Sequence, residues 1–311
     1  MRDIFGEEET DGVLLIDATN AFNTLNRNAL LHNIRYLCPS LSTYVRNVYG
    51  CPARLFVSGG SEIVSSEGTT QGCPVAMNSY GIGILPLLTT IKPENEPEKM
   101  KHVAYADDLG GGSRLKRLRE WWDRCVEHGP AFGYYPKASK SWLIVKEDQL
   151  EGAKELFRGT GVQITTEGRK YLGGFVGTTD GKDKYVGELV NNWVDQLQTL
   201  AMIAKSEPQA AYTAFTSGFR HKITYFIRTI PDLQDVLKPL DKVIDSKLIP
   251  AITEGHYCSS RDRRLLSLPV RLGGLGIPIF SELCVREYAV SRETTKQLRI
   301  KIQAQQHNYN G

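Results

Sequence analysis

Two short strand-like segments of this chain each end in aspartate, and this feature constrains the fold more than any other. Val13–Ile16 is followed by Asp17, and Met100–Ala106 is followed by Asp107 and Asp108. Short apolar runs are typical of buried strands. If the two strands are neighbours, three carboxylates converge at one edge of a sheet, where mutual repulsion and lost hydration call for a cation.

Such a cluster predicts a site for divalent metal. Hard oxygen ligands favour Mg2+ or Mn2+, and two ions about 3.5–4 Å apart can clamp both oxygens of an in-line phosphoryl displacement. The alternative is structural: Asp17 caps a turn, and Asp107 and Asp108 form a solvated turn. Each segment taken alone leaves both interpretations open, because short motifs recur by chance.

Length, composition and charge set wider limits. The chain has 311 residues, enough for one large domain or for two to three smaller ones. Hydrophobic residues make up 41% and charged residues 23%, which excludes a disordered, collagen-like or coiled-coil chain. No apolar run approaches the ~20 residues of a membrane helix. The net charge of +3 neither demands nor excludes a nucleic-acid partner.

Cysteine usage and the N-terminal residues bear on localisation. The six cysteines contain no CxxC pair and the histidines complete no zinc pattern, which favours free thiols in a reducing compartment. The first fifteen residues are acidic, so they contain no secretory or mitochondrial signal. We expect an intracellular protein, cytoplasmic or nuclear, without a transmembrane segment.

Hydrophobic periodicity divides the chain into a mixed part and a helical part. In the first part, short apolar runs alternate with helical patterns, which indicates an α+β layer. Within it, Val162–Thr165 and Lys170–Val176 are predicted to pair as strands. Asn26 and Ser113 are each predicted to cap a helix. In the second part, helical stretches divided at Pro208 and Pro231 predict a separate helical domain.

Five ordered motifs resemble those of reverse transcriptases. The segments similar to motifs A, B, C and D and to the primer-grip motif E are, in chain order, Asp17–Phe22, Gln71–Pro74, Tyr105–Asp108, Gly133–Lys140 and Lys170–Gly173. A further segment, Leu268–Gly276, resembles the region after the thumb in elements lacking long terminal repeats. Several motifs in order are more specific than one. The chain is therefore similar to the reverse transcriptases that such retrotransposons encode.

The resemblance implies a fold, a reaction and partners. The implied fold is α+β: a polymerase palm with a ferredoxin-like antiparallel sheet plus helices, followed by an all-α thumb. The palm would span residues 1–178, the thumb 179–256 and a C-terminal extension 257–311. The implied reaction is RNA-directed DNA synthesis, in which a nucleotide passes from a dNTP to a primer 3′-hydroxyl. RNA template, DNA primer, dNTP and two Mg2+ or Mn2+ ions are the implied partners and cofactors.

The motifs also imply a role for the residues that bind metal and select the sugar. Asp17, Asp107 and Asp108 match the catalytic, metal-binding aspartates, and the backbone carbonyl of Ala18 matches a further metal ligand. Phe22 matches the steric gate that excludes a ribose 2′-hydroxyl. The alternative for this residue is an ordinary core phenylalanine.

Other matched positions face the nucleotide and the primer. Gln71, Gly72 and Lys140 match nucleotide-binding positions, where a glycine lets the backbone approach closely. For Lys140 the alternative is a solvated lysine. A third set, Tyr171, Leu172 and Gly173, matches the primer grip.

Three features depart from the family pattern. Cys73 stands where the family commonly has aspartate, and the glycines Gly110–Gly112 would weaken the second strand of the catalytic hairpin. Only sixteen residues precede Asp17, so we expect the basic fingers segment to be missing and the chain to extend primers poorly. This leaves a rival interpretation, a catalytically inactive remnant that at most binds nucleic acid. An RNA polymerase with the same palm is disfavoured by Phe22.

Overall fold

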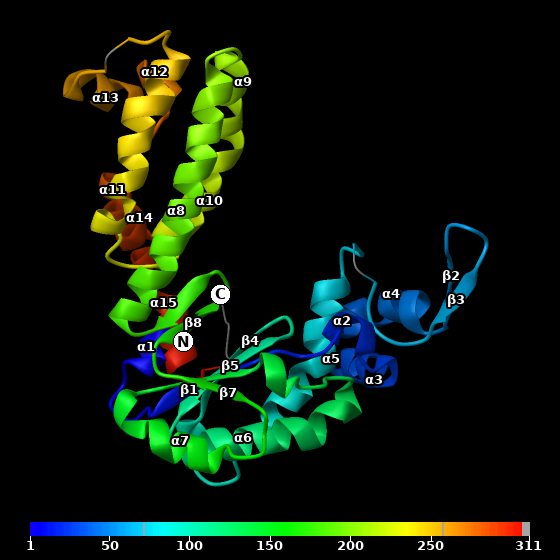
Figure 1. The fold of residues 1–311 in the computed structure, drawn as a ribbon. Coiled ribbons are helices and arrows are strands. Elements are labelled where there is room, and N and C mark those ends of the chain that lie inside the picture. The colour runs from blue at the N-terminus through cyan, green and yellow to red at the C-terminus, as the bar shows by residue number, and fades with distance from the viewer. Residues whose placement is uncertain (71, 257, 307–311) are drawn as a thin grey trace. The chain divides into compact units, whose positions relative to one another are not determined.

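The computed structural model describes residues 1–70, 72–256 and 258–306, and it divides the chain into two compact units (Figure 1). The first contains Met1–Thr166 together with the residues from Lys301 onward, and the second contains Glu167–Ile300. The domain limits expected at residues 178 and 256 stay predictions. Among the helices of the described ranges, none combines the length and apolar character that a bilayer crossing requires.

The first unit combines helices with a main sheet and a separate hairpin, and it confirms the predicted α+β class. Its helices are α1 (Arg2–Phe5), α2 (Ala21–Thr24), α3 (Arg27–Leu37), α4 (Pro39–Tyr49), α5 (Ala76–Thr90), α6 (Leu115–His128) and α7 (Leu150–Leu156). Its strands are β1 (Gly12–Ile16), β2 (Ala53–Phe56), β3 (Glu62–Ser65), β4 (Lys101–Tyr105), β5 (Asp108–Ser113), β6 (Trp142–Val145) and β7 (Gln163–Thr165). Short 3₁₀ turns cover Pro97–Lys99, Gly129–Phe132, Ala138–Lys140 and Glu147–Gln149.

The main sheet has the strand order β4-β5-β1-β6-β7. Neighbouring strands are antiparallel from β4 to β6, and β7 joins β6 in parallel, so the sheet is mixed at one edge. The predicted pairing of Val162–Thr165 with Lys170–Val176 is wrong. The first segment contributes β7 to this sheet, and the second lies in a hairpin of its own. The central strand β1 is buried along its whole length, as its continuous apolar run predicts.

The three consecutive glycines of β5 lie beside β1 and admit large core side chains. A Cβ on Gly111 would lie 2.3 Å from Cε of Met100 and 2.9 Å from Cζ3 of Trp121. A Cβ on Gly112 would lie 2.4 Å from Cγ2 of Ile4. The strand that the sequence suggests to be weak is therefore a point of close packing, where the missing side chains make room for buried ones.

The N-terminus of helix α6 is capped by a residue that is distant in the sequence. The Leu115 N–H donates to a carboxylate oxygen of Asp11 at 3.0 Å. Ser113 lies inside β5, and its hydroxyl donates instead to the carbonyl of Lys99 at 2.9 Å. The predicted cap at Ser113 is wrong, because strand pairing with β1 withdraws that residue from the helix end.

The second unit is helical apart from the hairpin of β8 (Gly168–Tyr171) and β9 (Gly174–Gly177). Its helices are α8 (Thr179–Ala204), α9 (Pro208–Ala214), α10 (Arg220–Thr229), α11 (Gln234–Val243), α12 (Ile249–Ile252), α13 (Ser260–Ser267), α14 (Phe280–Thr294) and the start of α15 (Lys296–Gln303). Two π-helical segments, Phe215–Phe219 and Ile244–Leu248, and a 3₁₀ turn, Val270–Leu272, complete it. Helices α8, α10, α11 and α14 enclose an apolar core (Figure 1). The separate helical part predicted from the sequence is confirmed.

Gly133 makes a contact that only glycine permits, and its replacement should destabilise the first unit. Its φ is +76°, and a Cβ there would lie 1.9 Å from the carbonyl oxygen of Thr24. We expect Gly133→Ala to lower the free energy of unfolding by about 3 kcal/mol or more, because backbone strain and overlap add. Denaturant titration measures this change.

Gly159 provides the matched control. It has a similar φ of +80°, but no atom lies within 4 Å of the place that a Cβ would take. Gly159→Ala should therefore cost only the ~1–2 kcal/mol of the left-handed backbone. Equal losses for the two variants would show that the close approach at Gly133 does not matter.

Candidate active site

The register of three strands brings the aspartates to one end of the main sheet. Ile16 pairs with Leu109 across β1 and β5, so Asp17 continues toward Asp108 at the next position. Tyr105 pairs with Asp108 across β4 and β5, which makes Ala106 and Asp107 the turn of that hairpin. The two predicted strands are not direct neighbours, because β5 lies between β1 and β4. It is β5, which begins at Asp108, that brings the second aspartate segment beside Asp17.

The electrostatics of this end show that negative charge accumulates at Asp108. Burial raises the pKa of the Asp108 carboxyl, and the negative charges of Asp107 and Asp17 raise it further. In the described part of the chain, the hydrogen bonds at Asp17 and Asp107 engage main-chain atoms and reach none of the three carboxylates. The carboxylate oxygens are therefore available to a cation.

The donor chemistry fits a hard cation, although the side chains are not gathered into a finished ligand set. Carboxylate and carbonyl oxygens are the ligands that Mg2+ and Mn2+ prefer. Within the described ranges, no three acidic, histidine or cysteine side chains lie close enough together to hold a metal ion. Binding would require the carboxylates of Asp17, Asp107 and Asp108 to turn toward each other.

The hairpin turn that carries Asp107 has a strained backbone. Ala106 has φ 54°, in the left-handed region that side-chain-bearing residues rarely adopt. This conformation costs about 1–2 kcal/mol for a residue with a Cβ. Such strain persists only where the surroundings determine the conformation, and it gathers at functional sites.

Asp17 is held by its main chain. Its carbonyl accepts a hydrogen bond from the Lys137 N–H at 2.8 Å, and its own N–H donates to the Ser141 hydroxyl at 3.3 Å. The next residue, Ala18, is buried and forms a β-bridge with Pro136. The segment after Gly133 thus fixes the backbone at the end of β1. Sequence reasoning singled out this segment by its resemblance to motif D but gave Ser141 no role.

Phe22 lies on α2, half-buried at the border of the core. Its ring stacks on Tyr80 of α5, with ring centroids 4.5 Å apart and planes at 25°. Its carbonyl accepts a hydrogen bond from the Thr69 N–H at 2.7 Å. The residue is therefore both supported by the core and partly exposed, and its role as a gate stays a prediction.

The predicted nucleotide-binding positions are only partly described. Gln71 lies outside the described residues. Gly72 has φ +89°, with open space where a side chain would be. Cys73 follows; a hydrogen bond with Tyr49 lowers the pKa of its thiol. Lys140 ends a 3₁₀ turn next to Ser141 with its side chain exposed, and its role at a triphosphate stays a prediction.

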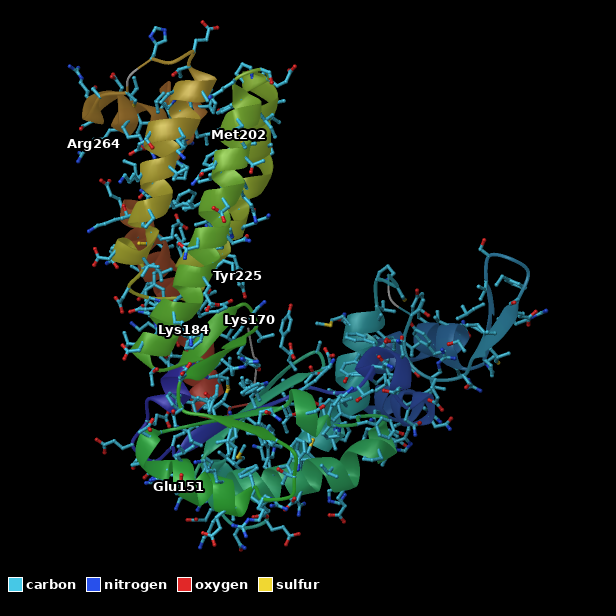
Figure 2. The ribbon with its side chains drawn as sticks, in the orientation of Figure 1. Glu151, Lys170, Lys184, Met202, Tyr225 and Arg264 are labelled. Carbon is cyan, nitrogen blue, oxygen red and sulfur yellow. The ribbon has the colours of Figure 1, made fainter. Side chains whose placement is uncertain are left out.

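The predicted primer grip is a tight hairpin in the second unit. Tyr171 ends β8, and the turn to β9 is made by Leu172 and Gly173, with φ 47° and 75°. The hydroxyl of Tyr225 on α10 donates to the Leu172 carbonyl. Figure 2 shows Tyr225 beside the hairpin that carries Lys170 of β8. A helix of this unit therefore holds the turn.

Comparison with known proteins gives little beyond this geometry. No protein-family model and no curated protein matches the chain. Solved structures similar to it include apo telomerase from Candida tropicalis, with TM-score 0.43 and 9% identity over 95% of this chain and 52% of that one.

Two telomerase structures in complex with a TWJ fragment of telomeric RNA are also similar. That from Candida albicans has TM-score 0.40 and 10% identity over 98% of this chain and 50% of that one. That from Candida tropicalis has TM-score 0.44 and 12% identity over 95% and 48%. The chain spans about half the length of these proteins. At similarity this low, functional assignment depends on the site itself.

Neutralising Asp108 should stabilise the chain in the absence of divalent ions. The carboxylate is partly desolvated and faces two like charges, so Asp108→Asn removes an unfavourable charge. We expect the melting temperature in EDTA to rise by about 1–3 °C. Excess Mg2+ or Mn2+ should then raise the wild-type melting temperature more than that of the variant, because a bound ion stabilises the folded state.

Glu98→Gln is the control, since it removes an exposed carboxylate from the 3₁₀ turn at Pro97–Lys99. It should leave both melting temperatures nearly unchanged. A fall in stability for Asp108→Asn in EDTA would contradict the repulsion that we infer.

Proposed function

We propose that this chain is the catalytic part of an RNA-directed DNA polymerase, of the kind encoded by retrotransposons lacking long terminal repeats. The reaction is attack of a primer 3′-hydroxyl on the α-phosphate of a dNTP, with release of pyrophosphate. One observation carries the proposal: the β1–β5 register places Asp17 beside Asp108, next to a strained hairpin turn at Asp107. The order of the surrounding motifs in the sequence supports it.

The proposed metal ligands are the carboxylates of Asp17, Asp107 and Asp108 and the carbonyl of Ala18. Two Mg2+ or Mn2+ ions held there would neutralise the charge that develops on the transferring phosphate. The contribution of the protein is mainly positioning: the backbone of Asp17 and that of Asp107 are each held by hydrogen bonds, so the carboxylates start from fixed points.

The remaining roles concern the nucleotide and the primer. We assign Phe22 to exclusion of the 2′-hydroxyl, since its ring is backed by the buried ring of Tyr80 and cannot retreat freely. Gly72 and Gln71 are assigned to the nucleotide, Lys140 to the triphosphate, and the turn at Leu172–Gly173 to the primer. RNA template and DNA primer are the proposed partners.

The rival function is a remnant that binds nucleic acid without catalysis. The departure at Cys73 and the carboxylates that are not gathered around a common point favour it. Because both functions predict nucleic-acid binding, only turnover and its dependence on Asp107 separate them.

Asp107→Asn should abolish primer extension while the protein stays folded. Loss of one metal ligand removes several kcal/mol of charge stabilisation, so we expect at least a hundredfold fall in rate. The assay is extension of a DNA primer on an RNA template with millimolar dNTP and Mg2+, with thermal melting as the folding check. Asp123→Asn, on the exposed face of α6, is the control and should retain wild-type rates.

Two results would decide against the proposal. Wild-type rates in a folded Asp107→Asn protein would remove the metal assignment. No extension by the wild-type chain under these conditions would favour the remnant.

Phe22→Val should relax discrimination between deoxyribonucleotides and ribonucleotides. Removing the ring opens the space that a 2′-hydroxyl needs, and steric exclusion in a packed site is worth about 1–3 kcal/mol. We expect ribonucleotide incorporation to rise about tenfold or more relative to dNTP, measured by single-nucleotide extension. Phe56→Val, on the exposed hairpin strand β2, is the control. Unchanged discrimination would make Phe22 a core residue only.

A further inference from the structure

One segment of the first unit contacts both strand ends that carry the carboxylates. The hydroxyl of Tyr134 donates to the main-chain carbonyl of Asp107 at 3.0 Å. A few residues later, the Lys137 N–H donates to the carbonyl of Asp17, and the Ser141 hydroxyl accepts from the Asp17 N–H. The two strand ends are therefore connected through residues 134–141 as well as through the sheet.

The Tyr134 hydrogen bond joins a buried ring to a partly buried turn. The side chain has no exposed surface and packs in the core of the first unit. Burial is the largest cause that raises the pKa of the phenol well above its usual value. Because a carbonyl can only accept, the Tyr134 hydroxyl is the donor of this bond.

The position of this bond matters because of the turn that it reaches. Ala106 is left-handed without the freedom of glycine, and Asp107 is the next residue. A strained turn relaxes unless neighbouring contacts hold it. In the described part of the chain, the Tyr134 hydroxyl is the side-chain group that hydrogen-bonds the Asp107 main chain.

We propose that Tyr134 is a positioning residue that holds the turn at Ala106–Asp107 in its strained form and so sets the place of the Asp107 carboxylate relative to Asp17. Ser141 and Lys137 hold the other end of the same connection. The link to catalysis rests on the proposed polymerase function, whereas the restraint on the turn does not.

Tyr80 provides a matched control within the same core. It is 1% exposed, and its hydroxyl has no hydrogen-bond partner in the described residues. It also lies close enough to Asp107 for that charge to raise the pKa of its phenol. Tyr80→Phe and Tyr134→Phe therefore delete the same atom from equally buried rings near the same aspartate, and only the second breaks a hydrogen bond.

The first experiment measures amide hydrogen exchange of the wild-type and variant chains without metal. Tyr134→Phe should speed exchange in the peptide covering Ala104–Leu109 by about tenfold or more, and Tyr80→Phe should leave it unchanged. Ser141→Ala, which removes the acceptor of the Asp17 N–H, should speed exchange at Asp17 instead. This third variant tests the connection even where Tyr134→Phe lowers overall stability. Equal exchange of the turn in the two tyrosine variants would overturn the proposal.

The second experiment measures primer extension as a function of Mg2+ concentration. Tyr134→Phe should raise the Mg2+ concentration for half-maximal rate several-fold and lower kcat at subsaturating Mg2+, with KM for dNTP nearly unchanged. Asp123→Asn, on the exposed face of α6, should match wild type. A loss that higher Mg2+ does not restore, or an equal loss in both variants, would overturn the positioning role. Altered exchange without extension by any chain, wild type included, would overturn the polymerase function but support the restraint on the turn.

Discussion

Packing of β1 against β5 is the interaction on which the acidic end of the first unit depends. Asp17 and Asp108 are neighbours by strand register, and burial adds to the cost of charging Asp108. The fold brings them together through apolar packing of β1 and β5, which the carboxylates themselves oppose. Among the described residues, the hydrogen bonds at Asp17 and Asp107 go to the main chain and not to the charged oxygens.

This division between backbone and side chain explains the strained turn. A relaxed turn at Ala106 would release its strain but would carry Asp107 elsewhere. The Tyr134 hydroxyl opposes that release, since a turn that moved would lose the hydrogen bond that the Asp107 carbonyl accepts. Rigid elements rather than a flexible loop therefore present the acidic side chains, which is the arrangement that a precise site requires.

The features that the sequence predicted well are local ones. The strand that ends at Asp17, the helix that begins after Asn26 and the helices divided at Pro208 and Pro231 follow from apolar spacing, caps and proline geometry. Asn26 shows this directly, since its side chain accepts the N–H of Ala29 at 3.1 Å. The meeting of the aspartate segments was also expected, although β1 pairs with β5 and not with the strand predicted at Met100–Ala106.

The features that the sequence missed depend on residues far apart in the chain. Asp11 replaces Ser113 at the start of α6, and β7 pairs with β6 rather than with the next strand, because sheet register decides both. The support of Asp107 by Tyr134 has no sequence signal of its own. A tyrosine in a glycine-rich turn is as compatible with a surface position as with a buried donor, and only the packed fold distinguishes them.

The glycines of β5 also limit which amino-acid substitutions the first unit tolerates during evolution. Met100 and Trp121 occupy the volume that any side chain at Gly111 would need, and Ile4 does the same at Gly112. A larger residue at Gly111 or Gly112 is therefore tolerated only after a smaller residue replaces the side chain that packs against it. These positions should vary together among relatives or not at all. This strand begins at Asp108. A substitution in the apolar core that shifts the strand would therefore also shift the Asp108 carboxylate.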